Sequence, residues 1–180
     1  MGLATFKGGI HPYEGKELSM SKPVSVLQPK GEMVFPLSQH IGAPAKPLVA
    51  KGDHVLVGQK IGEPGGFISA CIISSVSGTV KSLEPRMVAN GAMVPSIIVE
   101  NDGMYETVEG FGEDRDPKTL SKEEIRNIVK EAGIVGLGGA GFPTHVKLTP
   151  KDESAIDTII VNGAECEPYL TSDYRMVLEE

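Results

Sequence analysis

The segment Gly133-Ile-Val-Gly-Leu-Gly-Gly-Ala-Gly-Phe-Pro-Thr-His-Val-Lys-Leu148 carries five glycines in its first nine residues. Glycine reaches positive φ and has no side chain to hold a ligand away from main-chain N–H groups, so a loop of this kind suits a phosphate. Further along the chain, a short apolar run leads into Asn162-Gly-Ala-Glu-Cys-Glu-Pro168, which holds two acidic side chains. We expect the chemistry of the protein to lie in these two segments.

Two interpretations of the glycine-rich segment compete. Gly136-Leu-Gly-Gly-Ala-Gly141 satisfies the dinucleotide fingerprint G-x-G-x-x-G, and Glu165 follows a strand-like run roughly 20 residues later. Only Ile134-Val135 precede the motif, however, and Pro143 falls where the Rossmann helix should begin its hydrogen bonds. A P-loop is excluded because no Gly-Lys-Ser/Thr follows the glycines. The alternative is a glycine-rich turn that lets two elements pack closely, and both interpretations stay open on these residues alone.

A family resemblance favours a ligand-binding loop. Gly138-Gly-Ala-Gly-Phe-Pro-Thr144 with Lys147, followed by the segment from Asn162 to Arg175, resembles the flavin-binding region of the C subunit of the Rnf electron-transport complex. The flavin- and NADH-binding subunit of respiratory complex I is similar, more distantly. The opening Phe6-Lys-Gly-Gly-Ile-His-Pro12 also resembles the start of Rnf C subunits. The resemblance covers nearly all of the chain but only the first part of the family's usual length.

The resemblance implies the roles of ten residues. The loop glycines and Ala140 would line the phosphate and ribityl chain of FMN, Phe142 would shape the ring pocket, and Lys147 would add positive charge. Side chains after the apolar run would contact the isoalloxazine edge or the nicotinamide nucleotide. A flavin needs no protein nucleophile, so no catalytic residue is predicted, and no metal ligand either. The cofactor-binding set is Gly136, Gly138, Gly139, Ala140, Gly141, Phe142, Lys147, Asn162, Glu165 and Glu167.

Composition excludes several classes of protein. With 180 residues and 40% hydrophobic content the chain can bury a core. The net charge of −7 argues against a nucleic-acid surface. No run of about 18 apolar residues occurs, and the start lacks the apolar core of a signal peptide. Cys71 and Cys166 stand far apart without a C-x-x-C pair, which fits a reducing cytoplasm rather than a disulfide scaffold or a zinc or iron–sulfur site.

The first hundred residues are typical of an arm followed by a β domain. Residues 1–30, rich in Gly and Pro, predict an extended arm that lies across other elements. Residues 31–100 predict short strands of a sandwich or barrel, and residues 101–120 a polar linker. The expected strands are Met33-Val-Phe35, Leu48-Val-Ala50, His54-Val-Leu-Val57, Ile68 to Ile73, Gly78 to Leu83 and Ile97-Ile-Val-Glu100.

Parts of this β domain are similar to the lipoyl- and biotinyl-like barrel sandwich. Carriers of that fold attach a cofactor to a lysine at a hairpin tip, expected here near Glu63-Pro-Gly-Gly-Phe67, but no lysine occurs between Ile61 and Val80. A docking or packing platform is therefore favoured over a carrier. His40 and His54 could meet and bind a metal, yet no further ligand is spaced to complete the set, so a role as surface polar residues is favoured.

Residues 121–180 predict the beginning of an α/β flavin-nucleotide-binding domain. Ser121-Lys-Glu-Glu124 is a capping box, the apolar spacing from Ile125 to Ala132 predicts a helix with one buried face, and Gly133 ends it. Residues 155–161 predict a buried parallel strand, and a short helix is expected after Thr171-Ser172. The predicted fold class is thus mixed α+β: a lipoyl-like barrel sandwich, then the first part of a flavin domain, in a fragment of a longer protein.

The function that the resemblance implies is electron input. Electrons would pass between NAD(H) and iron–sulfur carriers or ferredoxin through FMN, in a peripheral subunit on the cytoplasmic side of an ion-translocating membrane complex. The 4Fe-4S clusters would lie beyond these 180 residues, which alone would be inactive. The partners would be the other subunits of the complex, NADH and ferredoxin. Two alternatives remain: a docking fragment with no ligand of its own, and a soluble relative that serves a different reductase.

Overall fold

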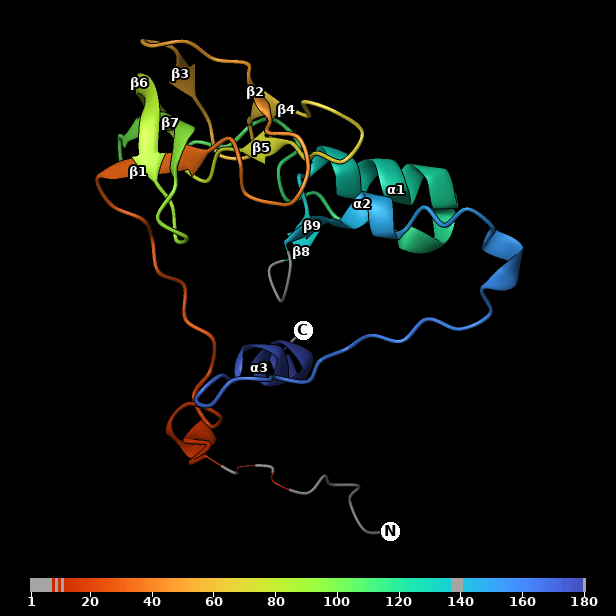
Figure 1. The fold of residues 1–180 in the computed structure, drawn as a ribbon. Helices are drawn as coiled ribbons and strands as arrows, with labels where there is room; N and C mark the ends of the chain where they lie inside the picture. Colours follow the sequence, from red (N-terminus) through yellow and green to blue (C-terminus); the bar gives the residue numbers. More distant parts are fainter. Residues whose placement is uncertain (1–7, 9, 11, 137–140, 180) are drawn as a thin grey trace. The chain divides into compact units, whose positions relative to one another are not determined.

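The structure is a computed structural model that describes residues 8, 10, 12–136 and 141–179. The chain divides into two compact units (Figure 1). One unit is Pro29–Ala155, and the other joins Met1–Gln28 to Ile156–Glu180. The arm and the end of the chain thus share a unit although more than 120 residues separate them in sequence.

The larger unit is built on two small antiparallel sheets. The first has four strands in the order β1-β7-β6-β3, and the second has three in the order β2-β4-β5. The strands are β1 (Glu32–Pro36), β2 (Lys46–Pro47), β3 (His54–Val55), β4 (Lys60–Glu63), β5 (Ile72–Ile73), β6 (Gly78–Met87) and β7 (Met93–Asn101).

One apolar core lies in this β domain. Strand β7 buries four successive residues, Ser96 to Val99, because it is a central strand between β1 and β6. Val55 of β3 and Ile61 of β4 bring side chains from both sheets into the same cluster. Sheet-on-sheet packing with a shared apolar interior is the arrangement of a barrel sandwich. The prediction of a β sandwich or barrel followed by a mixed region is confirmed.

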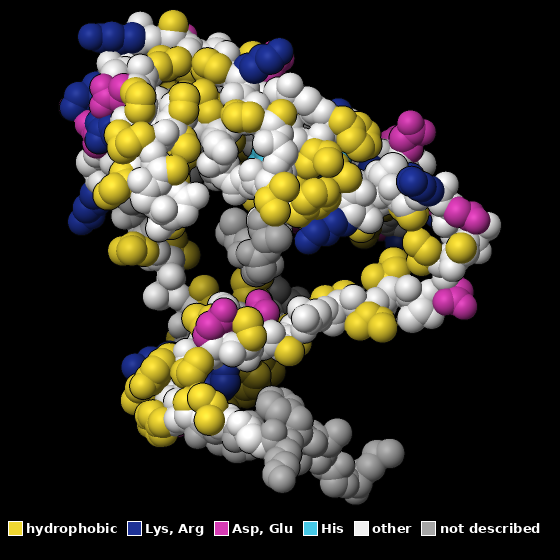
Figure 2. Space-filling view, viewed as in Figure 1, with side chains coloured by type: hydrophobic (Ala, Val, Ile, Leu, Met, Phe, Trp, Pro, Cys, Tyr) yellow, Lys and Arg dark blue, Asp and Glu magenta, His cyan; other side chains and the backbone are white. Residues whose placement is uncertain are grey.

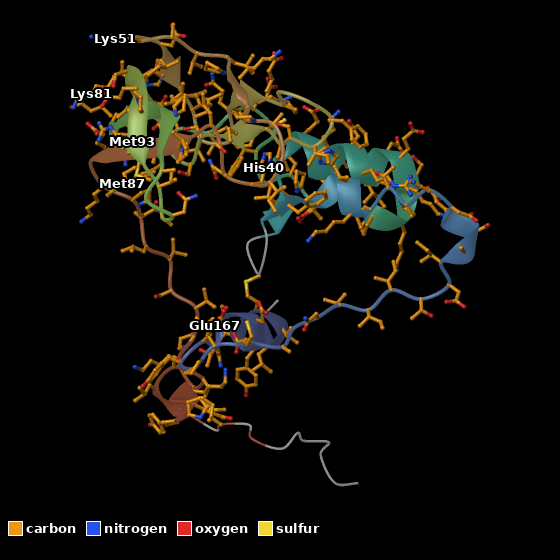
Figure 3. The ribbon with its side chains drawn as sticks, viewed as in Figure 1. His40, Lys51, Lys81, Met87, Met93 and Glu167 are labelled. Carbon is orange, nitrogen blue, oxygen red and sulfur yellow. The ribbon has the colours of Figure 1, made fainter. Side chains whose placement is uncertain are left out.

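The β6–β7 hairpin extends beyond the predicted strands. The sequence predicts strands at Gly78 to Leu83 and Ile97 to Glu100, but the ladder continues to a Met87–Met93 pair, with Pro85 opposite Pro95. Proline has no N–H to donate to the ladder. A strand tolerates it at a position where an N–H would have no acceptor on a neighbouring strand. The two methionines are exposed near the turn of the hairpin (Figure 3).

Two of the predicted strands are wrong in position. Leu48–Ala50 forms no strand, since β2 occupies Lys46–Pro47, and of Ile68–Ile73 only the last two residues pair. The residues between β4 and β5 form the hairpin loop instead, where Ala43 N donates to Ile68 O at 2.9 Å. The loop contains the stretch up to Phe67, where the lipoyl-like tip is expected. Loop-to-loop hydrogen bonds of this kind satisfy the backbone without a ladder.

Residues after β7 remain bonded to the β domain. Val57 N donates to Glu106 O at 2.8 Å and Val108 N to Val57 O at 3.0 Å, with a parallel bridge between Val57 and Thr107. A 3-10 turn, η2 (Pro117–Thr119), follows. The first part of segment 101–120 therefore lies against the β domain, and its role as a linker stays a prediction.

Helix α1 (Lys122–Glu131) begins at the predicted capping box. Glu124 N donates to Ser121 Oγ at 3.2 Å, and Ser121 N donates to the Glu124 carboxylate at 2.8 Å. Gly133 at φ +68° ends the helix, as predicted. The expectation of a buried face is wrong in degree, because Ile128 and Val129 are only half-buried. A helix of this length covers little apolar area when it packs mainly on another short helix, α2 (Thr144–Lys147).

The second unit contains little regular structure. A 3-10 turn, η1 (Lys16–Leu18), lies in the arm, and α3 (Ser172–Glu179) forms where a helix is predicted. Arg175 of α3 donates to Met20 O at 3.1 Å, and the Glu179 carboxylate accepts from Val24 N at 3.0 Å. Residues 20–24 of the arm thus lie against α3, and the extended arm over residues 1–30 stays a prediction.

The predicted strand at residues 155–161 does not form. Ala155 ends a 3-10 turn, η3 (Glu153–Ala155), and Ile159, Ile160 and Val161 are extended and 82–88% exposed. Figure 2 shows hydrophobic side chains along this stretch. A strand needs a neighbour for its N–H and C=O groups, and within the described part of the chain no strand pairs with it.

Candidate functional site

Two short strands stand on either side of the glycine-rich segment and pair as a small hairpin. Strand β8 (Val135–Gly136) pairs antiparallel with β9 (Phe142–Pro143), Gly136 opposite Phe142. A Rossmann loop joins a parallel strand to a helix, so the dinucleotide-fold interpretation is wrong. Gly138, Gly139 and Ala140 lie outside the described residues, and their predicted contacts with FMN remain predictions.

A lysine stands at the foot of this hairpin. Lys147 is the last residue of α2, and its Nζ would be 3.0 Å from a Cβ placed on Gly136. The absence of a side chain at Gly136 therefore gives the ammonium group room beside the start of the loop. A cation next to backbone N–H groups is suited to a phosphate.

Gly141 closes the loop on the β domain. Its φ of +61° lies in the left-handed region that favours glycine. Ile41 N donates to Gly141 O at 2.8 Å, and a Cβ at Gly141 would be 3.6 Å from Gln39 O. The far end of the loop is therefore anchored to the segment before β2.

His40 belongs to that anchoring segment rather than to a metal site. Its Nε2 accepts from Ala70 N at 3.1 Å, which leaves Nδ1 to donate to Ile41 O at 3.1 Å. His54 bonds instead to the Asp102 carboxylate at 3.3 Å. Within residues 8–136 and 141–179, as far as they are described, no three His, Cys, Asp or Glu side chains are grouped to hold a metal.

His145 lies on α2 between the hairpin and α1. Its Nδ1 is buried and has no hydrogen-bond partner among the residues described. Burial lowers the pKa of His145, and the nearby Lys130 lowers it further, so the imidazole is neutral at pH 7. Between these two α2 side chains, the positive charge beside the hairpin thus comes from Lys147. Phe142 is half-buried in β9, and Pro143 is fully buried.

The acidic segment is in the other unit, and its two acids have different surroundings. The Glu165 side chain is only 8% exposed, and its carboxylate accepts from Asp173 N at 2.8 Å and Ser172 Oγ at 3.3 Å. It therefore caps the N-terminus of α3, where a negative charge is favourable. Glu167 is exposed on the loop before α3 (Figure 3).

The neighbours of Glu167 are also local. Cys166 Sγ donates to the Glu167 carboxylate at 2.9 Å, and this bond to a carboxylate raises the pKa of the thiol. Asn162 Oδ1 accepts from Ala164 N at 2.9 Å, which makes a turn at the start of the segment. Cys166 is thus a protonated thiol at neutral pH, and Asn162 keeps its amide nitrogen for other partners.

The structure brings together part of the predicted set. Gly136, Gly141, Phe142 and Lys147 lie around one hairpin of the larger unit, whereas Asn162, Glu165 and Glu167 belong to the smaller one. Their common site remains a prediction. The sequence does not reveal one further candidate: Lys16 of the arm, which donates to the acidic segment. Nothing in the local sequence marks this contact, because its partners are more than 150 residues away.

The two regions of the chain match two families. Residues 4–104 match the RnfC barrel sandwich hybrid domain, and residues 129–180 match the Nuo51 FMN-binding domain. With the β sandwich and the glycine hairpin described above, these matches define a class of proteins that join a barrel-sandwich hybrid domain to an FMN-binding region. The first match spans more than half of the chain, and the chain belongs to the RnfC family.

Named relatives are similar over nearly the whole chain. The C subunit of the proton-translocating ferredoxin:NAD(+) oxidoreductase complex of Clostridium ljungdahlii is 45% identical over 98% of this chain and 39% of its own length. The C subunit of the Na(+)-translocating ferredoxin:NAD(+) oxidoreductase complex of Acetobacterium woodii is 44% identical, over 98% and 40%. The C subunit of the ion-translocating oxidoreductase complex of Rhodobacter capsulatus is 40% identical, over 97% and 34%. The chain therefore spans about two-fifths or less of these relatives.

The α-helices of the described residues are short, and the longest of them, α1, has 10 residues. In the parts of the chain that the structure describes, no helix has the length and apolar character needed to cross a bilayer.

Proposed function

We propose that this chain is the flavin-facing part of an electron-input subunit, which passes electrons between NAD(H) and iron–sulfur carriers or ferredoxin. The observation that carries the proposal is the glycine hairpin with Lys147 at its foot, in a region that matches an FMN-binding domain. The names of the relatives support the nicotinamide and ferredoxin parts. They also support a place among the subunits of an ion-translocating complex. We further propose that the chain is peripheral to the membrane, on its cytoplasmic side.

The residues of the hairpin fit FMN. The Lys147 Nζ lies 3.0 Å from where a Cβ on Gly136 would stand, so the lysine places a positive charge beside the start of the glycine-rich segment. In the proposed complex, Gly136, Gly138, Gly139, Ala140 and Gly141 give their main chain to the phosphate and ribityl chain. Phe142 borders the flavin ring, and Lys147 balances the charge of the phosphate.

The bound flavin would supply hydride acceptance from NADH and one-electron release to iron–sulfur carriers. The tasks left to the protein are binding, orientation and the exclusion of water. Because His145 is neutral, the positive charge that α2 offers to the phosphate is that of Lys147. The exposed Glu167 and the amide of Asn162 have free hydrogen-bonding capacity for ribose hydroxyls or the nicotinamide amide.

Glu165 has a smaller role than Glu167 in the proposed nucleotide site. Its carboxylate already accepts two hydrogen bonds from the start of α3. A carboxylate has about four lone-pair positions, so it can still accept from a ribose hydroxyl or a water. Its contact with the nicotinamide nucleotide is accordingly secondary to that of Glu167.

The visible spectrum of the native-length protein tests the proposal. The protein is reconstituted anaerobically with FMN, iron and sulfide, and recorded before and after NADH. Flavin absorption that bleaches on NADH addition is expected. Protein that retains no flavin would overturn the proposal and leave the hairpin as a packing element of a docking module. Recovery of the flavin absorption when a reductase outside a membrane complex accepts the electrons of the NADH-reduced protein would favour the soluble relative instead.

A charge variant sharpens the same test. Lys147→Gln keeps most of the length of the side chain but removes its charge, and should weaken FMN binding roughly tenfold, as expected for loss of a charge-assisted hydrogen bond. Lys151→Gln is the matched control, since the structure gives the exposed Lys151 side chain no partner among the described residues. Equal FMN affinity in both variants would remove Lys147 from the site.

A further inference from the structure

Lys16 of the N-terminal arm holds the loop that carries both acids. Its Nζ donates to Leu170 O at 2.9 Å and to Glu167 O at 3.3 Å, and it lies 3.9 Å from the Glu165 carboxylate. The Lys16 side chain is 30% exposed and that of Glu165 8%. One ammonium group therefore spans the loop from Glu165 to Leu170 and pairs with its buried acid.

Further bonds from the arm fix the same loop. Tyr169 N donates to Glu14 O at 2.6 Å, and Ser19 Oγ donates to Tyr169 O at 3.3 Å. Gly15 packs against the Tyr169 ring so closely that an added Cβ would overlap it. Tyr169 itself has φ +69°, a conformation that is strained for a non-glycine residue and needs surrounding contacts to persist. The arm supplies those contacts.

The arrangement separates the two acids by task. Glu165 is turned into the cap of α3 and toward Lys16. Glu167 gives only its backbone carbonyl to Lys16, so its carboxylate takes no part in the arm contact and stays exposed. Two neighbouring carboxylates would repel an anionic dinucleotide, and the lysine offsets the charge of one of them.

We infer that Lys16 is a positioning residue for the nicotinamide nucleotide: it fixes the acidic loop and neutralises Glu165, so that Glu167 meets the ribose hydroxyls. The inference rests on the function proposed above. It also assigns a role to the arm that neither matched domain gives it, because Lys16 lies in the region matching the barrel-sandwich domain and its partners lie in the FMN-binding region. The arm is then a part of the nucleotide site, contributed by the opening of the chain.

The rival explanation is that Lys16 only holds the arm against the acidic loop. Kinetic measurements distinguish this purely structural role from the positioning role. The native-length protein, loaded with FMN and clusters, is assayed for NADH oxidation with an artificial electron acceptor. Lys16→Gln should raise KM for NADH roughly tenfold, the effect of one charge-assisted hydrogen bond, while kcat and FMN content change less than about twofold. Lys16→Arg should recover most of the loss, because it restores the charge.

Salt dependence and a control complete the experiment. The rise in KM caused by Lys16→Gln should shrink between low ionic strength and about 0.5 M salt, because screening weakens the repulsion of the uncompensated acids. Lys22→Gln, in the same arm and with no side-chain partner among the described residues, should leave KM unchanged. Hydrogen exchange at the Tyr169 amide reports in parallel whether the arm is still docked.

The outcomes separate this inference from the proposed function. If the wild type bleaches with NADH but Lys16→Gln keeps its KM within a factor of two, the positioning role is overturned and the electron-input function stands. A second contrary result is that Lys16→Gln loses both FMN and the protection of the Tyr169 amide, with no recovery in Lys16→Arg. That result would show a purely structural role for Lys16 and would also overturn the positioning role. If the wild type itself fails to bleach, the proposed function falls, and the inference falls with it.

Discussion

The two units of this protein are stabilised in different ways. The β domain encloses a core in which Val55, Ile61 and Ile97 are completely buried. In the smaller unit no large apolar side chain of the described residues is fully buried, and its contacts are hydrogen bonds from the arm to α3 and its preceding loop. Hydrophobic burial is the dominant stabilising term in folding. The acidic segment of the proposed site therefore lies in the unit with the weaker internal support, where local opening is easiest.

The strongest test of this contrast is a cavity in the β core. Ile97→Ala should lower the free energy of unfolding of the β domain by about 3 kcal/mol, within the roughly 2–5 kcal/mol typical of such truncations. Urea unfolding followed by far-UV circular dichroism measures the change. Leu83→Ala, at the exposed position opposite Ile97 in the ladder, should cost less than about 1 kcal/mol.

Hydrogen exchange in Ile97→Ala also tests whether the units are independent. Protection of the Tyr169 amide should stay as in the wild type if each unit has its own stability. Simultaneous loss of protection in both units would show that they unfold together, and the contrast between them would then be one of composition only.

A smaller effect is expected from Gly15→Ala in the arm. Alanine at φ +62° is strained by about 1 kcal/mol, and its Cβ would also overlap the Tyr169 ring. The arm should detach, with exchange of the Tyr169 amide at least roughly tenfold faster. Gly31→Ala has a similar φ of +73° with open space around it, so it isolates strain from overlap. If both variants behave alike, the packing of the tyrosine on the glycine does not hold the arm.

Removing the α3 cap should have a comparable or slightly smaller effect. Glu165→Ala leaves Asp173 N without its acceptor, which costs about 1 kcal/mol at a helix N-terminus. Exchange at the Asp173 amide measures it. Glu165→Gln keeps an acceptor and should cost only part of this, so the difference between the two variants gives the share that depends on charge. An unprotected Asp173 amide in the wild type would contradict the cap.

The smallest expected effect is on the stability of the β domain at low pH. Hydrogen bonds from Ser77 Oγ and Met104 N lower the pKa of Asp102 below its ordinary 3.8. A folded-state pKa below the unfolded one adds stability above about pH 4, which is lost as pH falls through the folded value. Asp102→Asn should make the melting temperature of the β domain fall less steeply as the pH drops below about 4 (the acid limb). Asp114→Asn, for whose carboxylate the described structure gives no partner, should keep it. A steep loss of stability already at about pH 6 would mean that groups other than this carboxylate set the acid limb.

Elements with local signals were predictable from the sequence. The capping box at Ser121 and the glycine at 133 set the ends of α1, because both act within one helical turn. Short β-prone runs located β1, β6 and β7. The β6–β7 ladder continues past Pro85, where the residue opposite is also a proline, Pro95. Strand propensities do not reveal this pairing of two prolines.

Elements that depend on distant partners were not predictable. Residues 155–161 have the composition of a buried strand, but a strand exists only through its neighbours. The site shows the same limit. The glycine loop and Lys147 form one sequence motif, and the hairpin brings the two together, whereas Lys16 meets the acidic loop across more than 150 residues. The capping role of Glu165 also depends on where α3 begins, which the two acids in Glu165-Cys-Glu167 do not indicate.

The contact between the arm and the acidic loop can form only late in the biosynthesis of the protein. Lys16 leaves the ribosome long before Leu170, its partner 154 positions later. At roughly 5–20 residues per second, the arm waits roughly 8–30 s for its docking site to be translated. During that interval the β domain is complete and can fold, while Glu14 and Lys16 of the arm are still without their partners in the acidic loop and are open to wrong ones. Pausing of translation before residue 165 should therefore lower the yield of assembled nucleotide site more than that of the β domain.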